Sequence, residues 1–321
     1  MRRVRFPLLL ALLALAAIPA RARGLVFVMN SGAASISLID MSTERVLRRI
    51  PVLREPHHWA LTPDRRSLVV GDSSGNSLFF LDPRTGAVQK RITVADPYQL
   101  GFSPDGRYFT VNGLARNQID VYDAASMKLL HRFPIRSMPS HLAYSPGSHR
   151  VFVTLQGTNR LVAIDLRRMR VLWDRPVGNT PAGILWHDGK LLVCDMGTDG
   201  LAVVNPATGA VTGHVVTDKG AHNLFLSPSG KTIWVDNRVS GTVTVLDAAS
   251  LKTVHTYRVS GGPDDLFFGP DGKVWITRRF AESVAVLDRA TGRYRVIDVG
   301  RSPHGIFVNP AAPSPGEGTM R

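Results

Sequence analysis

Short apolar segments alternate with polar turns along the whole chain, and the same pattern returns every 40 to 42 residues. Its clearest marker is an apolar segment that is closed by an acidic or amide residue. The marker occurs seven times and ends at Asp40, Asp82, Asp123, Asp165, Asn205, Asp247 and Asp288. Seven copies at this period predict that one small β unit is repeated around an axis or along a line.

Each unit predicts four antiparallel strands joined by tight turns. In residues 97–135 we expect strands at Leu100–Phe102, Tyr108–Val111, Ile119–Tyr122 and Leu129–Ile135, with the turn 103–106 after the first. That turn reads Ser-Pro-Asp-Gly, in which proline presets φ, aspartate bonds its own backbone and glycine allows a positive φ. Because no segment reads as a helix, seven such units favour an all-β, seven-bladed β-propeller over a sandwich.

The two ends of the repeat region complement each other. Leu25–Val28 matches the second strand of the unit, whereas Pro303–Pro310 matches the first. We therefore expect the N- and C-terminal strands to share one blade, which closes the circle and leaves no unpaired sheet edge. The predicted propeller covers residues 23–310. Residues 311–321 are rich in Ala, Pro, Ser and Gly and are expected to form a disordered tail.

The first 22 residues have the pattern of a Sec-type signal peptide. Arginines at positions 2, 3 and 5 precede an apolar run of 11 residues, Leu8–Ile18, and Ala20-Arg21-Ala22 is a small-x-small cleavage site. This pattern predicts cleavage near Ala22 and a periplasmic or secreted protein. No segment reaches the roughly 18 to 20 apolar residues of a membrane-spanning helix, so we expect no transmembrane segment.

The charge of the chain narrows the range of partners. The sequence has 39 Lys and Arg against 25 Asp and Glu, a net charge of +14; without the four arginines of residues 1–22, 35 basic residues and a net charge of +10 remain. These basic residues are spread through the repeats without interleaved aromatics, which predicts no nucleic-acid partner. A small anionic ligand or another periplasmic protein fits better, the alternative being a solvated basic surface without a specific partner. We expect a monomer.

Motifs of known enzyme classes are missing from the sequence. Cys194 is the single cysteine, so it cannot form an internal disulfide, and its apolar neighbours 191–193 predict a buried strand position. There is no C-x-x-C-H motif for covalent haem and no G-x-S-x-G elbow. The glycines lie in turns and do not form a nucleotide-binding pattern.

Candidate chemistry gathers where the first strand of each unit begins. We call the residue six before the turn proline the first funnel position; it holds His57, Tyr98, Ser140, Ala182, His222, Asp264 and His304. In a propeller the innermost strands converge on a central funnel, and four consecutive blades would bring three imidazoles and a carboxylate together. His57, His222, Asp264 and His304 therefore form a candidate site for a transition-metal ion.

The next residue, the second funnel position, is also polar in most units. It holds His58, Gln99, His141, Gly183, Asn223, Asp265 and Gly305, and the sequence does not decide which of the two sets faces the axis. Candidate ligand-binding residues of the funnel are Tyr98, His58, His141 and Asp265, with Asp72, Asn237 and Arg278 at the ends of second strands. Arg278 and Arg279 could pair an anionic ligand or a carboxylate of Asp264 or Asp265. Alternatively, these polar residues hydrate the channel mouth or cap strand ends.

The strand ends Phe27–Asn30, Phe109–Asn112 and Val151–Thr154, together with the Ser-Pro-Asp-Gly turn, resemble YVTN-type propellers of forty-residue repeats. Over residues 24–310 the chain is similar to the periplasmic YncE-like proteins. This resemblance implies the fold and carries no catalytic residues. Thr232–Asn237 with residues 240–243 also resembles the haem d1 propeller of nitrite reductases and their biogenesis proteins.

These observations predict an exported propeller that binds a ligand or partner through its funnel, or serves as a scaffold. Two alternatives from other classes stay open. One is a metal-dependent enzyme with a His/Asp site in the funnel, and the other is a haem d1-binding or biogenesis protein that uses an axial histidine.

Overall fold

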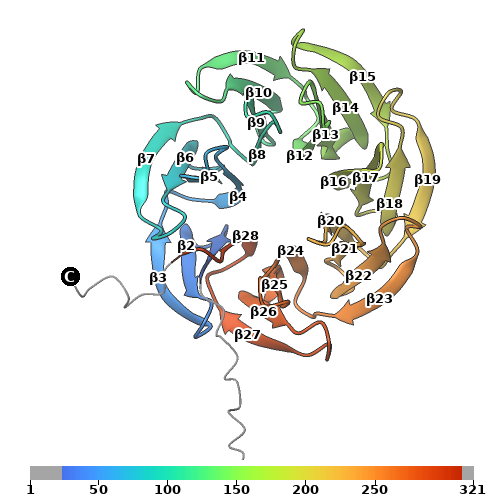
Figure 1. Cartoon of the computed structure of the whole chain (residues 1–321). Coiled ribbons are helices and arrows are strands. Elements are labelled where there is room, and N and C mark those ends of the chain that lie inside the picture. The colour runs from blue at the N-terminus through green and yellow to red at the C-terminus, as the bar shows by residue number, and fades with distance from the viewer. Residues whose placement is uncertain (1–23, 313–321) are drawn as a thin grey trace, which may run out of the picture.

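In the computed structural model, which describes residues 24–312, seven four-stranded antiparallel sheets surround a common axis (Figure 1). The prediction of an all-β, seven-bladed propeller is confirmed. Residues 1–23 and 313–321 lie outside the described part, so the predicted signal peptide and most of the predicted tail lie there too.

In each blade the four strands are named below in their order in the sheet, from the innermost strand at the axis to the outermost. Blade 1 contains β28 (Pro303–Asn309), β1 (Leu25–Asn30), β2 (Ser35–Asp40) and β3 (Arg45–Pro51). Blade 2 contains β4 (Pro56–Leu61), β5 (Leu68–Asp72), β6 (Ser77–Leu81) and β7 (Val88–Thr93). Blade 3 contains β8 (Gln99–Phe102), β9 (Tyr108–Gly113), β10 (Gln118–Asp123) and β11 (Leu129–Pro134). Blade 4 contains β12 (Pro139–Tyr144), β13 (Arg150–Leu155), β14 (Arg160–Asp165) and β15 (Arg170–Pro176).

Blade 5 contains β16 (Pro181–His187), β17 (Lys190–Asp195), β18 (Gly200–Val204) and β19 (Val211–Val216). Blade 6 contains β20 (Ala221–Leu226), β21 (Thr232–Asn237), β22 (Thr242–Asp247) and β23 (Thr253–Arg258). Blade 7 contains β24 (Pro263–Phe268), β25 (Val274–Arg278), β26 (Ser283–Leu287) and β27 (Tyr294–Asp298). Two single-turn 3₁₀ helices, η1 (Gln156–Thr158) and η2 (Arg279–Ala281), follow β13 and β25, so the expectation of no helical segment is wrong at these two turns.

The ends of the propeller close as the sequence predicts. β1 pairs with β2 on one side and with β28 on the other, and Leu25 lies opposite Asn309. Blade 1 is thus built from both ends of the chain. In Figure 1 the blue strands of the N-terminal part and the red-brown β28 lie in this one blade.

The acidic or amide residue that closes each repeat forms the turn after the third strand. Its side-chain oxygen accepts a hydrogen bond from a backbone N–H two or three residues ahead, which is the geometry of an Asx turn. This bond is present at Asp40, Asp82, Asp123, Asp165, Asn205, Asp247 and Asp288. The repeat marker in the sequence is therefore a turn-forming residue.

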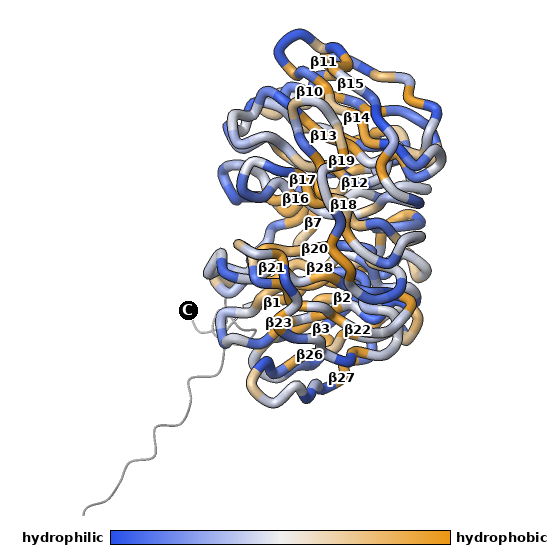
Figure 2. Tube along the Cα trace, turned by 90° about the vertical axis from the view of Figure 1, so that its right-hand side faces the viewer, coloured by the Kyte–Doolittle hydropathy of each residue, from blue (hydrophilic) through white to orange (hydrophobic). Residues whose placement is uncertain are grey.

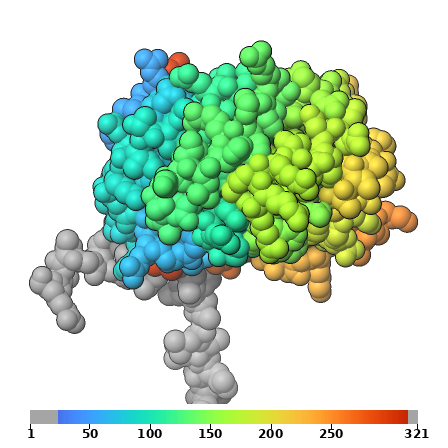
Figure 3. All heavy atoms as spheres, turned by 90° about the horizontal axis from the view of Figure 1, so that it is seen from above, coloured from blue at the N-terminus to red at the C-terminus, as the bar shows by residue number. Residues whose placement is uncertain are grey.

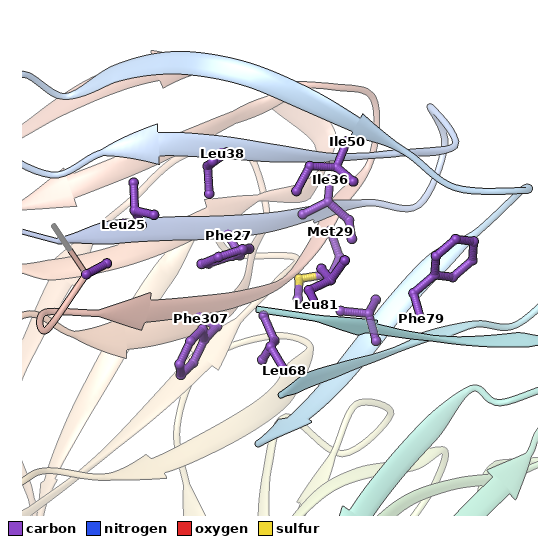
Figure 4. Close-up of a cluster of buried hydrophobic side chains, with 12 residues drawn as sticks. Leu25, Phe27, Met29, Ile36, Leu38, Ile50, Leu68, Phe79, Leu81 and Phe307 are labelled. Carbon is purple, nitrogen blue, oxygen red and sulfur yellow. The ribbon is translucent and has the colours of Figure 1, made fainter. Parts of the chain in front are cut away.

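The hydrophobic core lies between neighbouring blades. In the cluster of Figure 4, Phe27 and Met29 of β1 pack with Leu68 of β5 and Leu81 of β6, so blade 1 is held against blade 2. Burying each such side chain contributes about 1.5–3 kcal/mol. Apolar residues gather in the inner strands, such as β1 and β2, whereas outermost strands such as β7 are largely hydrophilic, and Figure 2 shows this mixture along the trace. Blades adjacent in the chain are in contact over the face shown in Figure 3. No helix within residues 24–312 is long and apolar enough to cross a membrane.

Candidate functional site: a histidine cluster on the propeller axis

A β-bulge shapes the start of most innermost strands. In β4, β12, β16, β24 and β28, two consecutive residues lie opposite a single residue of the second strand, and in β20 one residue is inserted. In β4 the pair is His57 and His58, between the partners Pro56↔Asp72 and Trp59↔Val70. A bulge interrupts the regular alternation of side chains, so both funnel positions can reach the axis.

Threonines on the second strand stabilise two of these bulges. Thr154 accepts a hydrogen bond from the N–H of His141 at 3.0 Å, and its hydroxyl donates to the carbonyl of Ala182 in the next blade at 2.9 Å. Thr277 does the same between Asp265 N–H at 3.0 Å and the carbonyl of His304 at 2.8 Å. These threonines satisfy the extra backbone groups of the bulge and join neighbouring blades near the axis.

Five histidine rings meet at the axis. The ring centroid of His57 lies 3.8 Å from that of His304 and 4.9 Å from that of His58. The His141 ring is 5.0 Å from His58 and 5.4 Å from His222. All five side chains are buried. The cluster combines His57, His222 and His304 from the first funnel position with His58 and His141 from the second.

Tyr98 adds an aromatic ring from blade 3, and small residues allow the close packing. The Tyr98 ring centroid is 4.1 Å from that of His57, and burial raises the pKa of its hydroxyl to about 12. Gly305 is required beside His57, because a Cβ atom there would lie 2.7 Å from the His57 carbonyl oxygen. Blade 5 contributes only Ala182 and Gly183 at its two funnel positions.

Asp264 is the centre of a buried ion-pair network beside the histidines. Its Oδ2 lies 2.9 Å from His304 Nδ1 and 3.2 Å from Arg279 Nη1, and its Oδ1 contacts a terminal nitrogen of Arg238. His222 Nδ1 lies 2.9 Å from the Asp264 carbonyl oxygen. Burial opposes ionisation, but His304, His222 and Arg238 hold the pKa of Asp264 well below its usual range.

The histidines are held in the neutral form. Burial, reinforced by neighbouring imidazoles, lowers the pKa of His57 and His58 well below the usual value and that of His141 to about 3. Burial also lowers the pKa of His304, against the opposing effect of Asp264. Since a carbonyl can only accept, we infer that Nδ1 of His222 carries its proton; the carboxylate of Asp264 favours the same tautomer in His304.

Two further buried carboxyl groups lie near this network. Asp265 accepts hydrogen bonds from the N–H groups of Leu266 and Ile306, and burial together with Asp264 raises its pKa well above the usual value. Asp236, on β21, is fully buried, and neither of its oxygens has a hydrogen-bond partner within residues 24–312. Burial and the negative charges of Asp265 and Asp264 raise its pKa as well.

The predicted residues at the ends of second strands tether loops. Asp72 accepts four backbone hydrogen bonds, three of them from residues 53–55, and the Asn237 amide donates to Thr242 and Thr244. Arg278 donates to the carbonyl of Ser260 and the hydroxyl of Ser283. These three side chains are therefore engaged outside the histidine cluster, whereas Arg279 makes the expected ion pair with Asp264.

Several nitrogens of the cluster have no hydrogen-bond partner among the described residues: His57 Nδ1, His58 Nε2, His141 Nε2 and both nitrogens of His304, whose Nδ1 approaches Asp264 without hydrogen-bond geometry. His57, His58 and His304 can each offer one nitrogen such that the three lie within 4.8 Å of one another. A metal–imidazole bond measures about 2.0–2.1 Å, so two ligands of one ion lie at most ~4.2 Å apart. Three nitrogens around one ion lie about 3.3–3.6 Å apart in trigonal or tetrahedral geometry, so the rings would have to move closer together to bind it.

Sequence reasoning missed two groups at this site. Arg238 follows β21 directly and is not marked by any funnel position, but it occupies the same place in blade 6 as Arg279 in blade 7. Asp236 lies in an apolar strand pattern between Val235 and Asn237, and no recurring position of the repeat marks it. A comparison of the residues just beyond each second strand could have found Arg238.

The fold and the site define a seven-bladed propeller with a buried histidine cluster and an ion-pair network on its axis. The chain matches the family described as YNCE-like beta-propeller over residues 6–314, and it belongs to this family. None of the curated proteins matches the chain.

Solved structures with the same fold include enzymes and a protein of unknown function. Dihydro-heme d1 dehydrogenase NirN, solved in complex with DHE, is 16% identical with a TM-score of 0.66, covering 91% of this chain and 78% of its own. The periplasmic gluconolactonase PpgL of Pseudomonas aeruginosa is 18% identical with a TM-score of 0.72, covering 89% and 98%. A functionally unknown protein from Desulfotomaculum acetoxidans is 15% identical with a TM-score of 0.75, covering 91% and 100%. At these identities the likeness extends to the fold alone.

Proposed function

We propose that this protein is an exported propeller that binds a transition-metal ion at its axis, with His57, His58 and His304 as ligands. The observation that carries the proposal is the convergence of these three buried imidazoles, each with a nitrogen that lacks a partner among the described residues. Neutral imidazole is a common ligand of zinc, copper, iron and nickel. A bound ion would accept the lone pairs that are otherwise buried at a cost of about 1–3 kcal/mol each.

The neighbouring groups support this ligand set. Asp264 Oδ2 lies 2.9 Å from Nδ1 of His304, and this carboxylate favours a proton on Nδ1 and a free lone pair on Nε2. Carboxylate–histidine–metal arrangements of this kind orient ligands in many metal sites. Because Asp264 is also paired with two arginines, we assign it to this supporting role and not to the metal itself. Three imidazoles leave a fourth position for water or a substrate, and a metal there would supply Lewis acidity.

Haem d1 is the second candidate, because NirN has the same fold and was solved with DHE. The packing of the cluster favours the ion. Ring centroids of His57, His58 and His304 lie 3.8 to 4.9 Å apart. A tetrapyrrole is wider than these gaps and would have to displace several buried side chains, whereas an ion would not.

The metal proposal is tested on tag-free protein after removal of metals with a chelator. Incubation with Zn²⁺, Cu²⁺, Ni²⁺ or Fe²⁺ followed by dialysis and elemental analysis should leave a single ion of at least one metal per chain. We expect this ion to be lost in His304→Gln and in His58→Gln. His214→Gln removes an exposed imidazole of β19 and serves as the matched control, which should retain the ion.

The spectrum of the Co²⁺-loaded protein provides a second readout, because visible d–d bands report ligand geometry and would change on loss of one imidazole. Sub-stoichiometric metal in the wild type, or equal binding by His304→Gln and His214→Gln, would contradict the proposal. A titration with haem that shifts the Soret band and is abolished in His304→Gln would favour the second candidate instead.

Export is proposed from the charged, apolar and small-residue pattern of residues 1–22. Expression of the full chain in a Gram-negative host should yield a periplasmic protein whose intact mass corresponds to a start near Arg23. As a control, Leu8–Ile18 interrupted by two arginines should keep the protein uncleaved in the cytoplasm. Recovery of full-length, uncleaved wild-type protein from the cytoplasm would argue against export.

A further inference from the structure

Arg238 and Arg279 occupy equivalent places in two neighbouring blades. Each follows the second strand of its blade, and each donates its backbone N–H to a glycine carbonyl, Arg238 to Gly220 at 2.9 Å and Arg279 to Gly262 at 2.8 Å. Because blades 6 and 7 are adjacent, this equivalence brings the two guanidinium groups side by side at one carboxylate, that of Asp264.

The same place in other blades also directs its side chain inward. In blade 4 it holds Gln156, whose amide donates to the Ser140 hydroxyl at the first funnel position. In blade 1 it holds Ser31, whose hydroxyl donates to the Pro56 carbonyl at the start of β4. The backbone therefore directs the side chain that follows the second strand toward the funnel. In blades 6 and 7 this position holds an arginine.

The two arginines exceed the negative charge that faces them. Asp264 is the one acidic side chain within residues 24–312 with which either arginine forms an ion pair. Two guanidinium groups and one carboxylate leave an excess of one positive charge at this place.

Both arginines retain donors and remain accessible to solvent. A guanidinium has five N–H donors. Asp264 is the one side-chain partner of each group among the described residues, and Nε of Arg238 is buried without any partner. The side chain of Arg238 is 20% exposed and that of Arg279 22%, so a ligand can reach them from solvent.

We propose that Arg238 and Arg279 form a binding site for a small oxyanion, a carboxylate or a phosphate, at the mouth of the histidine cluster. The anion would neutralise the excess positive charge and accept hydrogen bonds from the free N–H groups, as carboxylates and phosphates do when they bind guanidinium groups. The residues that follow the two arginines in the chain, Val239 and Phe280, are apolar and 71% and 66% exposed. They provide a place for the carbon skeleton of an organic anion. This site does not require the metal.

The test uses metal-free protein at low ionic strength and isothermal titration with inorganic phosphate, succinate and benzoate as separate probes. We expect saturable binding of at least one probe at one site, weakened at least tenfold in Arg238→Gln and in Arg279→Gln. Arg132→Gln is the matched control, since Arg132 pairs with buried Asp120 in blade 3, away from the funnel; it should bind as the wild type does.

The three probes distinguish an organic carboxylate from a phosphate as the ligand of this site. Preferential binding of benzoate or succinate that weakens in Phe280→Ser identifies an organic carboxylate, whereas phosphate binding that is insensitive to Phe280→Ser identifies an inorganic or phosphorylated ligand. If a Gln variant does not fold, Arg238→Lys and Arg279→Lys retain a positively charged partner for Asp264. These variants should show a smaller loss of affinity for the anion than the Gln variants. No saturable binding, or equal affinities in the wild type and all arginine variants, would overturn the proposal while leaving the metal proposal intact.

Discussion

Replacing Asp264 with asparagine is expected to lower the free energy of unfolding at pH 7 by about 3–5 kcal/mol, the usual cost of removing one partner of a buried ion pair. The Asp264 carboxylate is completely buried and contacts His304, Arg238 and Arg279. Asparagine keeps the shape but removes the charge, so two guanidinium groups would face one another without compensation. A loss of this size would be a large part of the stability of the whole domain.

Urea unfolding of the wild type and of Asp264→Asn, followed by circular dichroism, measures this change. Asp174→Asn is the control, because Asp174 pairs with Arg160 on an outer strand where both side chains are more than a third exposed. Such a pair contributes only ~0–1 kcal/mol. A change at Asp264 no larger than that at Asp174 would mean that the buried network does not depend on this carboxylate.

Much of the fold could be predicted from the sequence because turn-forming residues recur at equivalent positions of each repeat. Asp123 and its equivalents mark the turn after each third strand, and glycines such as Gly106, with φ of 70°, mark the turn after the first. These local signals recur at the same spacing, so the number of blades follows from counting them. The match of Leu25–Val28 and Pro303–Pro310 to different strands of the unit then predicts the closure that β1 and β28 show.

The site could be predicted only in part, because it depends on pairing between strands. Regular alternation would turn either His57 or His58 toward the axis, and the bulge in β4 that brings both into the cluster is a property of its register with β5. Thr154 and Thr277, which lie opposite two of the bulges, are the only sign of this geometry that the sequence offers, and it is a weak one. Arg238 could not be paired with Asp264 from sequence, since their contact crosses from blade 6 to blade 7.

The strongest effect of pH on stability is expected below pH 6.5. Burial lowers the pKa of the five axial histidines in the folded state, so the unfolded chain binds more protons as the pH falls through the ordinary value of 6.5. The contribution of these histidines to the free energy of unfolding is therefore fully present above that pH and decreases below it. The decrease is up to about 2 kcal/mol per histidine between pH 7 and pH 5. Asp264, whose folded pKa is depressed, adds a further loss below about pH 4.

Two groups act in the opposite direction. The raised pKa of Asp236 and Asp265 means that the folded state holds their protons more tightly than the unfolded chain, so both add stability as the pH falls toward 3.8. Five histidines outweigh two aspartates above pH 5, and the sum is a net loss of several kcal/mol between pH 7 and pH 5. Urea unfolding at pH 5, 6, 7 and 8 measures this slope.

Single variants assign the slope to the cluster. His141→Gln removes a buried imidazole whose pKa lies at about 3, and it should reduce the loss between pH 7 and pH 5 by about 2 kcal/mol. His214→Gln removes an exposed imidazole of β19, outside the axial cluster, and serves as the control that should keep the slope of the wild type. A flat profile in the wild type, or the same slope in both variants and the wild type, would show that the axial histidines take up protons without unfolding the propeller. In that case they could not remain neutral metal ligands at pH 5, and metal release on mild acidification would replace unfolding as the acid response.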